Sequence, residues 1–519
     1  MNPLTFTDSY KLSHKGFMNE GTEVIYSNMT PRSDKYFTAK PDNEQTCVVS
    51  FGLQAFIKEY LIDEWNREFF NKPKEEVIGS FKRLIDAYLG EGAVSMQHFE
   101  ELHDLGYLPI EIKAIEEGNR VNIGVPVFSI VNTHLQFGWF TNYLETVMSC
   151  ELWKPMTTAT TMYYFRKLVN EFAMKTTGSL DGTQFQLHGF EFRGMSGRHD
   201  AMKNAAAMLL STNGTDTVPA LPFIEKYYGD DITQTFVATS VPASEHSVAC
   251  LGTAVEGELN SYRKWITKDY PTGIVSLVSD TYDYWKVLTE YLPELKEDIM
   301  NRPVNALGLS KVVIRPDSGD PVRIICGYED HEVEYTNNGY VCLVSGNRLT
   351  DEEVKGSIQI LWEIFGGEVN ELGYKVLDSH IGLIYGDSIT YERAKDILSR
   401  LERKGFASTC VVLGIGSYSI NYVSRDTLGF AVKATAATVN GVDIELFKDP
   451  KTDDGTKKSA RGRLVVVGDS GNYSLIDQIQ DSIYVGYIDR LKPLFKDGKL
   501  VRETSFDEIK TRLWSTTNS

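Results

Sequence analysis

Residues 315–319 (Arg-Pro-Asp-Ser-Gly) carry the strongest chemical signal in the sequence. They follow the apolar run 312–314, so a short buried strand would deliver an arginine and a carboxylate to one point. Arginine binds planar amide, carboxylate or phosphate groups, and aspartate binds ribose hydroxyls or the shell around Mg²⁺. The alternative is a surface turn in which Asp317 and Gly319 serve the backbone and Arg315 makes a structural ion pair.

Residues 414–417 (Gly-Ile-Gly-Ser) form a second candidate segment, between the apolar run 411–413 and a predicted helix. Backbone N–H groups at a helix N-terminus can bind a phosphate. The segment is neither a complete GxGxxG motif nor a Walker A motif, so glycines that simply end a strand are the alternative. Arg425 could add positive charge.

Three carboxylates also follow predicted strands: Asp280, Asp283 and Asp387. Each alone is more often a turn or helix N-cap residue than a ligand. Parallel strands in one barrel, however, have their carboxyl ends at the same face. Several carboxylates at that face favour a site for ribose, or for Mg²⁺ and a phosphate.

Residues 240–247 (Ser-Val-Pro-Ala-Ser-Glu-His-Ser) follow another apolar run, 236–238. His246 could be a base, a nucleophile or a phosphate acceptor, whereas an ordinary loop histidine is the alternative. Phe190 and Phe192 alternate around one residue, a spacing typical of core side chains, although stacking on a cofactor is a second interpretation.

The elements that must position these residues are predicted to be parallel β/α units. Between about 184 and 425, short apolar segments repeatedly lead into polar loops that contain glycine, and often onward into helices. The clearest helix follows Gly386, with apolar side chains on one face at 394, 397, 398 and 401. We therefore expect an α/β fold, an irregular (β/α) barrel with its site at the carboxyl ends of the strands, in preference to an open doubly wound sheet.

Both chain ends show other patterns. Residues 51–69 and the stretch after Pro73 have helical periodicity, residues 110–131 show strand patterning, and 464–476 predicts a β-hairpin. The domains expected from this division are a barrel at 151–425 and a smaller α+β domain at 1–150 with 426–519.

The chain has 519 residues and a formal net charge of −18, from 53 Lys and Arg against 71 Asp and Glu. This balance argues against a nucleic-acid partner. The six cysteines are scattered without a CxxC pair, and no HExxH motif is present. Neither a signal sequence nor an apolar stretch long enough to span a membrane occurs, so we expect a cytoplasmic protein without a membrane partner.

Together and in this order, the motifs resemble the family of type II phosphoribosyltransferases that act on nicotinamide or nicotinate. The resemblance covers nearly the whole chain, and its specificity comes from six or more motifs in register. The segments that carry it are 7–11, 108–114, 214–218, 240–247, 278–283, 314–319, 447–450 and 505–509.

The resemblance implies transfer of 5-phosphoribosyl from phosphoribosyl pyrophosphate to nicotinamide, giving nicotinamide mononucleotide and pyrophosphate in NAD salvage. It implies a homodimer with active sites shared across the interface, Mg²⁺ as a cofactor, and ATP as an activating co-substrate that phosphorylates His246. Asp216 would accept a hydrogen bond from the amide of nicotinamide and would repel the carboxylate of nicotinate. Arg315 would face the ring and its amide.

Other roles that the resemblance implies fall into groups. Phe190 and the partner subunit's Tyr10 would stack on the two faces of the pyridine ring. Catalysis would involve His246, Asp280, Arg315 and Asp317. Further substrate-binding residues would be Arg193, Ser240, Ser276, Gly386, Asp387, Gly416, Ser417 and Arg425. Pyrophosphate or ATP would contact Arg32, Lys433 and Lys448. Mg²⁺ would bind through pyrophosphate, with Asp280 and Asp317 as candidate ligands.

The sequence departs from the family pattern in places. Gly189 and Glu191 stand where the family has Asp and Gly, and Ser417 lies in a glycine-rich loop. Gly429 and Ala431 replace polar residues near the pyrophosphate positions. Residues 323–379 align poorly, so no function is assigned to them.

Three alternatives stay open. A nicotinate phosphoribosyltransferase would have the same fold and chemistry, and Asp216 argues against it. A catalytically silent barrel could act as a binding protein. Against loss of activity stands the joint retention of Phe190, Asp216, His246, Arg315 and Asp317. A phosphate-binding barrel lyase lacks an obvious Schiff-base lysine at a strand end.

Overall fold

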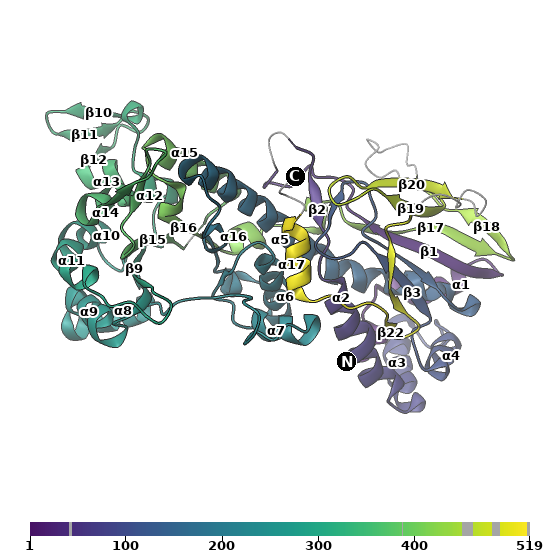
Figure 1. The fold of residues 1–519 in the computed structure, drawn as a ribbon. Helices are drawn as coiled ribbons and strands as arrows, with labels where there is room; N and C mark the ends of the chain where they lie inside the picture. The colour runs from purple at the N-terminus through teal and green to yellow at the C-terminus, as the bar shows by residue number, and fades with distance from the viewer. Residues whose placement is uncertain (41–43, 387, 449–459, 480–487, 516–519) are drawn as a thin grey trace. The chain divides into compact units, whose positions relative to one another are not determined.

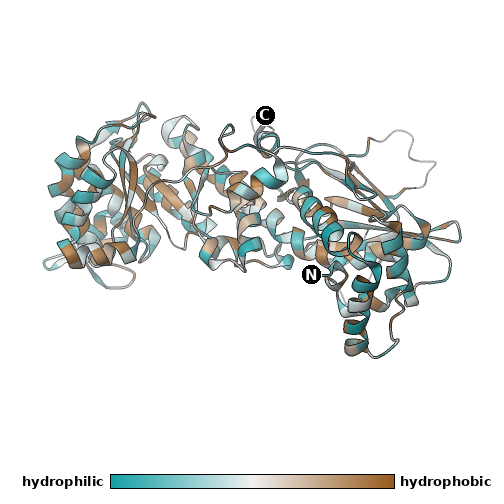
Figure 2. Cartoon of the chain, turned by 90° about the horizontal axis from the view of Figure 1, so that it is seen from below, coloured by the Kyte–Doolittle hydropathy of each residue, from teal (hydrophilic) through white to brown (hydrophobic). Residues whose placement is uncertain are grey.

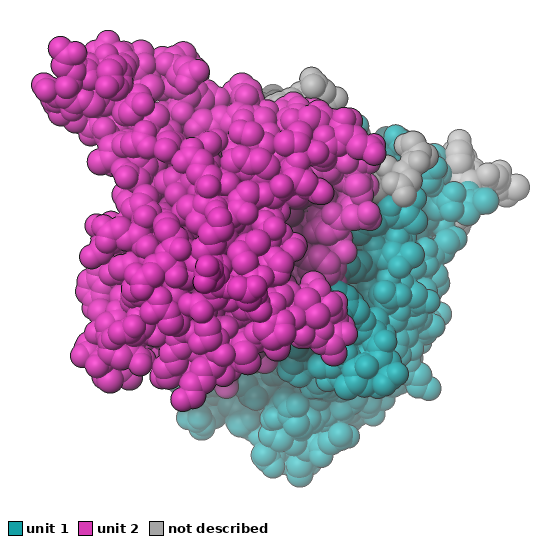
Figure 3. All heavy atoms as spheres, turned by 60° about the vertical axis from the view of Figure 1, so that its left-hand side comes forward, with its two compact units in different colours: residues 1–160, 220–236, 423–519 teal, residues 161–219, 237–422 magenta. Residues whose placement is uncertain are grey.

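The computed structural model describes residues 1–40, 44–386, 388–448, 460–479 and 488–515. They form two compact units, which we describe separately (Figure 3). Unit 1 comprises 1–160, 220–236 and 423–519, and unit 2 comprises 161–219 and 237–422. Residues 220–236, which we expected in the barrel domain, group with the chain ends instead, because Tyr228 of this segment stacks on Phe51 with ring centroids 5.3 Å apart.

Unit 2 contains, within the described residues, a six-stranded parallel sheet with the order β7-β6-β16-β15-β9-β8. Five of these strands lie where the apolar runs predicted them. The strands are β6 (Leu187–Gly189), β7 (Gly214–Thr215), β8 (Gly273–Val278), β9 (Ser310–Arg315), β15 (Ile381–Tyr385) and β16 (Val411–Ile415).

The two edges of this sheet meet the same segment of chain. Thr239 forms a parallel bridge with Gly214 of β7, and Ala243 forms one with Ser276 of β8. The sheet therefore curls into an irregular barrel, which confirms the predicted fold class. The apolar run 236–238 does not form a strand, and Thr239 and Ala243 after it make only isolated bridges.

Helices follow most of the barrel strands and pack on one hydrophobic core (Figure 1). The predicted helix after Gly386 is α15 (Tyr391–Arg403), with Ala394, Ile397, Leu398 and Leu401 buried as expected. Thr390 caps it by accepting a hydrogen bond from the Arg393 N–H, at 3.2 Å. The other helices used below are α8 (His246–Glu256), α10 (Tyr284–Lys286), α12 (Pro321–Cys326) and α16 (Ser417–Ile420).

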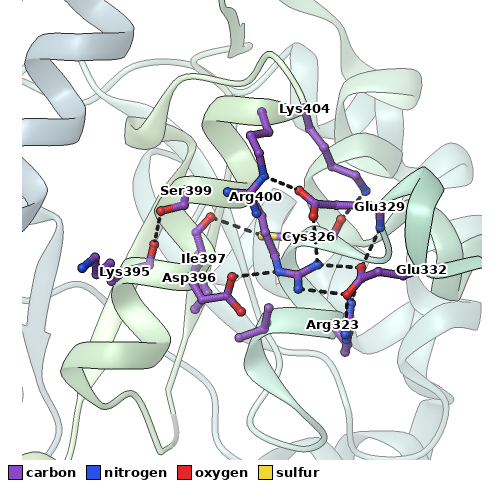
Figure 4. A network of polar contacts seen from close by, with 12 residues as sticks. Arg323, Cys326, Glu329, Glu332, Lys395, Asp396, Ile397, Ser399, Arg400 and Lys404 are labelled. Atoms are coloured by element: carbon purple, nitrogen blue, oxygen red, sulfur yellow. Dashed lines mark hydrogen bonds and ion pairs between the residues drawn. The ribbon is translucent and has the colours of Figure 1, made fainter. Parts of the chain in front are cut away.

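The tract that aligned poorly, 323–379, contains small antiparallel pairs between α12 and β15. These are β10 (Val333–Thr336), β11 (Gly339–Cys342), β12 (Arg348–Leu349), β13 (Gly367–Val369) and β14 (Lys375–Leu377), with helices α13 (Asp351–Lys355) and α14 (Ser357–Phe365). Glu332 ties the tract to the barrel helices through Arg323 of α12 and Arg400 of α15 (Figure 4).

Unit 1 is built on a seven-stranded sheet within the described residues, with the order β18-β17-β1-β5-β3-β21-β22. The N-terminal strand β1 pairs antiparallel with β17 from the C-terminal part, so both chain ends share one sheet, as predicted (Figure 1). The strands are β1 (Thr22–Thr30), β3 (Ile110–Ala114), β5 (Phe128–Asn132), β17 (Ala431–Val439), β18 (Val442–Glu445), β21 (Lys492–Lys496) and β22 (Lys499–Leu500).

Other predicted elements of unit 1 are also present. Residues Leu53–Phe70 are helical, as α2 (Leu53–Phe56) followed by the π-helical segments Ile57–Glu64 and Asn66–Phe70. The helix α3 (Lys74–Leu89) follows Pro73, and β19 (Arg463–Val467) pairs with β20 (Ser474–Ile479). The 40-residue helix α5 (Gly138–Thr177) has its residues up to Thr160 in unit 1 and the rest in unit 2. The helices mix hydrophobic and hydrophilic residues (Figure 2), and in the described part of the chain none is long and apolar enough to cross a membrane.

Candidate active site

The carboxyl ends of the barrel strands deliver the predicted residues of unit 2. Phe190 follows β6, Asp216 follows β7, Asp280 follows β8, and Arg315 is the last residue of β9. Because the strands are parallel and curl into a barrel, these residues lie at the same end of unit 2.

Asp216 is held by two side chains from neighbouring segments. Its Oδ1 lies 2.8 Å from His188 Nε2 and accepts a hydrogen bond from the Ser240 hydroxyl at 2.6 Å. Burial opposes ionisation of the carboxyl, but these two hydrogen bonds outweigh burial and lower its pKa. The side chain is still 42% exposed, so an ionised carboxylate with a fixed orientation faces the space at the strand ends.

Phe190 lies against the strand on the other side of β6. A Cβ atom at Gly414 of β16 would come within 2.7 Å of Phe190 Cδ2, so the ring occupies space that only glycine leaves. The ring centroid of Phe190 is 4.7 Å from that of His188. The resulting group of Phe190, His188 and Asp216 presents an aromatic face beside a hydrogen-bond acceptor, which suits a flat ring with an amide substituent.

His246 and Asp280 form a second group. Asp280 Oδ1 lies 3.0 Å from His246 Nε2, and Oδ2 accepts hydrogen bonds from the Asp317 N–H at 2.9 Å and the Ser318 hydroxyl at 2.6 Å. Burial raises the pKa of Asp280, but hydrogen bonds from Ser318, Asp317 and His246 outweigh burial and lower it. Asp280 is only 3% exposed while His246 is 48% exposed, so a buried carboxylate orients an accessible imidazole.

Arg315 and Asp317 complete the strand ends. Arg315 donates a hydrogen bond to the Ser244 carbonyl at 2.7 Å, and its Nε lies 3.7 Å from Asp317 Oδ1. A Cβ atom at Gly386 would lie 2.5 Å from Asp317 Oδ1, so a larger residue there would displace the Asp317 carboxylate. Asp387 lies outside the described residues.

Ser276 of β8 forms the bridge to Ala243, and its buried hydroxyl has no hydrogen-bond partner among the described residues. A buried unpaired hydroxyl is costly unless a ligand or solvent satisfies it. Of all the hydroxyls in the predicted set, this one therefore has the clearest need for an external partner.

The predicted phosphate segment meets the turn that carries Arg193. A Cβ atom at Gly194 would lie 2.2 Å from Ser417 Oγ, and Asn421 donates a hydrogen bond to the Gly194 carbonyl at 2.8 Å. The structure therefore places Arg193 and the segment 416–417 in neighbouring loops. The helix predicted after this segment is only α16, four residues long, so its dipole adds little beyond the local N–H groups.

The remaining predicted residues lie in unit 1. Tyr10 is 60% exposed and donates a hydrogen bond to Asp8 at 3.0 Å. Lys433 lies 3.7 Å from Glu145, and Arg32 donates to the Gly429 carbonyl at 3.1 Å. Arg425 and Lys448 belong to the same unit, and both are exposed. The candidate residues are thus divided between the two units.

One carboxylate of the sequence analysis has a structural role. Asp283 caps α10 by accepting a hydrogen bond from the Lys286 N–H at 3.0 Å, which was the alternative for each strand-end aspartate. Asp280 differs because its two oxygens face His246 and the 317–318 turn.

Two departures from the family pattern have a steric explanation. Gly429 has a φ of +62°, and a Cβ atom there would lie 3.0 Å from the Ser33 N. A Cβ atom at Gly189 would lie 2.8 Å from the Oε2 of the buried Glu191. Sequence reasoning missed Glu191, although a carboxylate between two phenylalanines was a signal that could have identified it.

The described residues contain no group of three or more His, Cys, Asp or Glu side chains that could hold a metal ion. Asp280 and Asp317 lie in adjacent strand-end loops, with the Asp317 N–H bonded to Asp280. One or two carboxylates together with substrate phosphates are a usual environment for Mg²⁺. Asp317, whose side chain is 32% exposed, therefore fits a metal that arrives with a phosphorylated substrate better than the buried Asp280, whose two oxygens already have partners.

The chain is similar to known proteins over most of its length. Residues 185–498 match the model of the nicotinate phosphoribosyltransferase (NAPRTase) family. A nicotinamide phosphoribosyltransferase of Acinetobacter baylyi is 50% identical over 514 residues, 99% of this chain and 97% of that protein. One of Xanthomonas campestris pv. campestris is 32% identical over 520 residues, covering 98% and 97%. A nicotinate-nucleotide pyrophosphorylase from Pyrococcus furiosus has a similar fold, with a TM-score of 0.53 at 15% identity over 100% of this chain and 96% of that one.

Proposed function

The chain belongs to the nicotinate phosphoribosyltransferase family, and we propose that its pyridine substrate is nicotinamide. In the proposed reaction the ring nitrogen of nicotinamide attacks C1 of the ribose in phosphoribosyl pyrophosphate. The bond from C1 to the pyrophosphate oxygen breaks, and its electron pair leaves with pyrophosphate. The products are nicotinamide mononucleotide and pyrophosphate.

The observation that carries the choice of nicotinamide is the environment of Asp216. His188 and Ser240 orient one oxygen and favour the ionised form, while the carboxyl stays accessible. An ionised carboxylate accepts a hydrogen bond from an amide N–H₂ but repels another carboxylate. Loss of that hydrogen bond and two like charges in contact would favour nicotinamide over nicotinate by a factor of about 10³ or more.

Catalysis in this proposal depends on position and charge rather than on a protein nucleophile at the sugar. The ribose becomes oxocarbenium-like as the leaving group departs, and negative charge develops on pyrophosphate. Arg193 and the 416–417 segment would hold the 5′-phosphate, and Asp280 and Asp317 would contact the ribose or Mg²⁺. Mg²⁺ would supply charge neutralisation at the leaving pyrophosphate.

We further propose that ATP stimulates the reaction by phosphorylating His246. The geometry that supports this role is the hydrogen bond between Nε2 and the buried Asp280, which leaves Nδ1 as the accessible nitrogen. The γ-phosphoryl group would move to that nitrogen, and ADP would leave with the electrons of the broken bond. Asp280 would stabilise the positive charge on the ring.

The protein is proposed to act as a homodimer in the cytoplasm, with each active site completed by the partner subunit. Supporting this, the candidate residues are divided: Phe190, Asp216 and Arg315 lie in unit 2, whereas Tyr10, Arg32 and Lys433 lie in unit 1. An exposed Tyr10 would then stack on the face of the base opposite Phe190.

The deciding experiment measures mononucleotide formation from phosphoribosyl pyrophosphate and Mg²⁺ with nicotinamide or nicotinate, each with and without ATP. We expect kcat/KM for nicotinamide to exceed that for nicotinate by a factor of about 10³. Comparable turnover of the two bases would instead favour a nicotinate phosphoribosyltransferase. No product from either base at saturating substrate would favour a binding protein without this activity.

A further inference from the structure

Glu191 is a buried carboxyl to which the proposed reaction assigns no role. Its side chain is 0% exposed, although it lies between Phe190 and Arg193 in the chain. Glu191 Oε1 accepts a hydrogen bond from the Thr217 hydroxyl at 2.7 Å. Burial raises its pKa, which favours the neutral acid over the carboxylate.

The surrounding structure leaves space for this carboxyl. A Cβ atom at Gly189 would lie 2.8 Å from Glu191 Oε2 and 3.1 Å from Thr215 Oγ1. Any larger residue at 189 would therefore displace Glu191. Oε2 has no hydrogen-bond partner among the described residues. Within those residues, the Thr217 hydroxyl therefore makes the only side-chain hydrogen bond to the Glu191 carboxyl.

The hydrogen bond joins the two loops that carry the base-binding residues. Glu191 lies in the loop after β6, directly after Phe190, and Thr217 lies in the loop after β7, directly after Asp216. At the strand ends these loops also share the hydrogen bond from the Asp216 N–H to the Gly189 carbonyl, at 2.9 Å. Thr217 is fully buried, so its side chain points into the barrel wall while the neighbouring Asp216 stays accessible.

We propose that Glu191 is a positioning residue for the pyridine substrate, and this rests on the proposed binding of nicotinamide by Asp216 and Phe190. By accepting from Thr217, Glu191 fixes the 215–217 turn and thereby holds the Asp216 carboxylate at a set distance from the ring of Phe190. A small displacement of either group would weaken the amide hydrogen bond or the stacking. Glu191 itself does not contact the substrate.

The effect of removing Glu191 should fall mainly on the base. Glu191→Ala leaves the Thr217 hydroxyl without its acceptor and opens a cavity beneath Asp216. We expect KM for nicotinamide to rise about tenfold, because the misplaced carboxylate no longer meets the amide. KM for phosphoribosyl pyrophosphate should change less than about twofold, because its phosphate is also held by the 416–417 segment.

Two further variants separate positioning from bulk. Glu191→Gln keeps an oxygen that can accept from Thr217, so it should restore KM for nicotinamide to within about twofold of the wild type. Thr217→Val removes the same hydrogen bond without opening a cavity, and it should raise KM for nicotinamide severalfold. If Glu191→Ala does not fold, Thr217→Val still tests the proposal.

Glu117 provides a matched control. It is also a buried carboxyl whose pKa burial raises, and it accepts hydrogen bonds from the Gln54 N–H and the Tyr228 hydroxyl in unit 1. Glu117→Ala should lower the melting temperature without raising KM for nicotinamide. If Glu191→Ala and Thr217→Val both leave KM for nicotinamide unchanged in an active enzyme, Glu191 does not position the base, and the proposed function still stands. A wild-type protein that does not use nicotinamide would overturn the proposed function.

Discussion

At the scale of single residues, strand-end aspartates look alike in the sequence but have different roles. Asp283 accepts from the Lys286 N–H and starts a helix, whereas Asp280 contacts the His246 ring and the 317–318 turn. No local pattern distinguishes them, because the distinguishing partners lie up to 38 residues away in the chain. The sequence therefore identified candidates, and tertiary contacts separated Asp283, a helix cap, from Asp280, which contacts other candidate residues.

The role of Asp216 predicts an altered base preference in Asp216→Asn. The amide side chain keeps an oxygen acceptor but has no charge, so repulsion of nicotinate disappears while the hydrogen bond to nicotinamide weakens. We expect the ratio of kcat/KM for nicotinamide to that for nicotinate to fall about 100-fold. Steady-state assays with both bases check this, and an unchanged ratio would show that Asp216 does not set the preference.

The pairing of His246 with Asp280 predicts how ATP acts. In His246→Ala the phosphate acceptor is absent, so the rates of transfer with and without ATP should become equal. Radiolabelled γ-phosphoryl from ATP should remain on the wild-type protein but not on the variant. ATP stimulation that persists in the variant would rule out the phosphohistidine step.

At the scale of elements, the network around Glu332 fastens the poorly aligned tract 323–379 to the barrel (Figure 4). Glu332 accepts from Arg323 at 2.6 and 2.8 Å and from Arg400 at 2.7 and 3.0 Å. Burial raises the pKa of Glu332, but the hydrogen bonds from the two arginines outweigh burial and hold this pKa well below its usual range. The tract thus has a structural attachment that its sequence did not predict.

Glu332→Gln should therefore destabilise unit 2. The variant removes the carboxylate that Arg323 and Arg400 share. Asp396 still pairs with Arg400, but the loss should cost about 3 kcal/mol in the free energy of unfolding at pH 7. A carboxyl whose pKa folding lowers stabilises the native state above its unfolded-state pKa and loses that contribution as the pH falls. The difference between wild type and variant should therefore shrink below about pH 4.5.

Urea unfolding followed by circular dichroism at several pH values measures this difference. Glu334→Gln is the matched control, since Glu334 lies two residues away and is exposed, and it should change stability by less than about 0.5 kcal/mol. Equal destabilisation by both variants at pH 7 would contradict the role of the network.

Regular elements were more predictable than irregular ones. The helix α15 follows from apolar residues at helical spacing, and five parallel strands follow from apolar runs before glycine-bearing loops. The segment 239–243, which bridges the sheet edges, contains Pro242 and makes isolated bridges only. Its position depends on the curl of the whole sheet, which no local pattern encodes.

At the scale of the whole molecule, the proposed sharing of active sites predicts complementation between inactive variants. Tyr10→Ala and Asp216→Ala would each lack one contribution to every site. Co-expression should yield mixed dimers with one intact site, and random assembly predicts about a quarter of wild-type activity. Light scattering on the same sample should give the mass of a dimer.

Asp216→Ala with Phe190→Ala is the matched control for complementation. Both residues lie in unit 2 of the same subunit, so each site of a mixed dimer would lack one of them. This pair should recover no activity. Recovery in the control, or none in the Tyr10 and Asp216 pair despite dimer formation, would contradict a site shared between subunits.

The sequence by itself determined the chemistry available and the fold class. Arg315, Asp317, His246 and the strand-end glycines were identified because short apolar runs place their neighbours at the ends of parallel strands. The net charge of −18 argues against nucleic-acid partners but does not reveal local charge, since the anion-binding candidates are a few Arg and Lys in a chain with an acidic balance.

Only the tertiary structure decided which of these residues act together. The contacts of Asp216 with His188 and Ser240, and of Glu191 with Thr217, join segments 24 to 28 residues apart in the chain. Periodicity and composition describe neighbours within a few residues, whereas hydrogen-bond partners and buried space depend on how strands pair across the barrel. For that reason the buried Glu191 and the glycine that makes room for it became evident only in the folded chain.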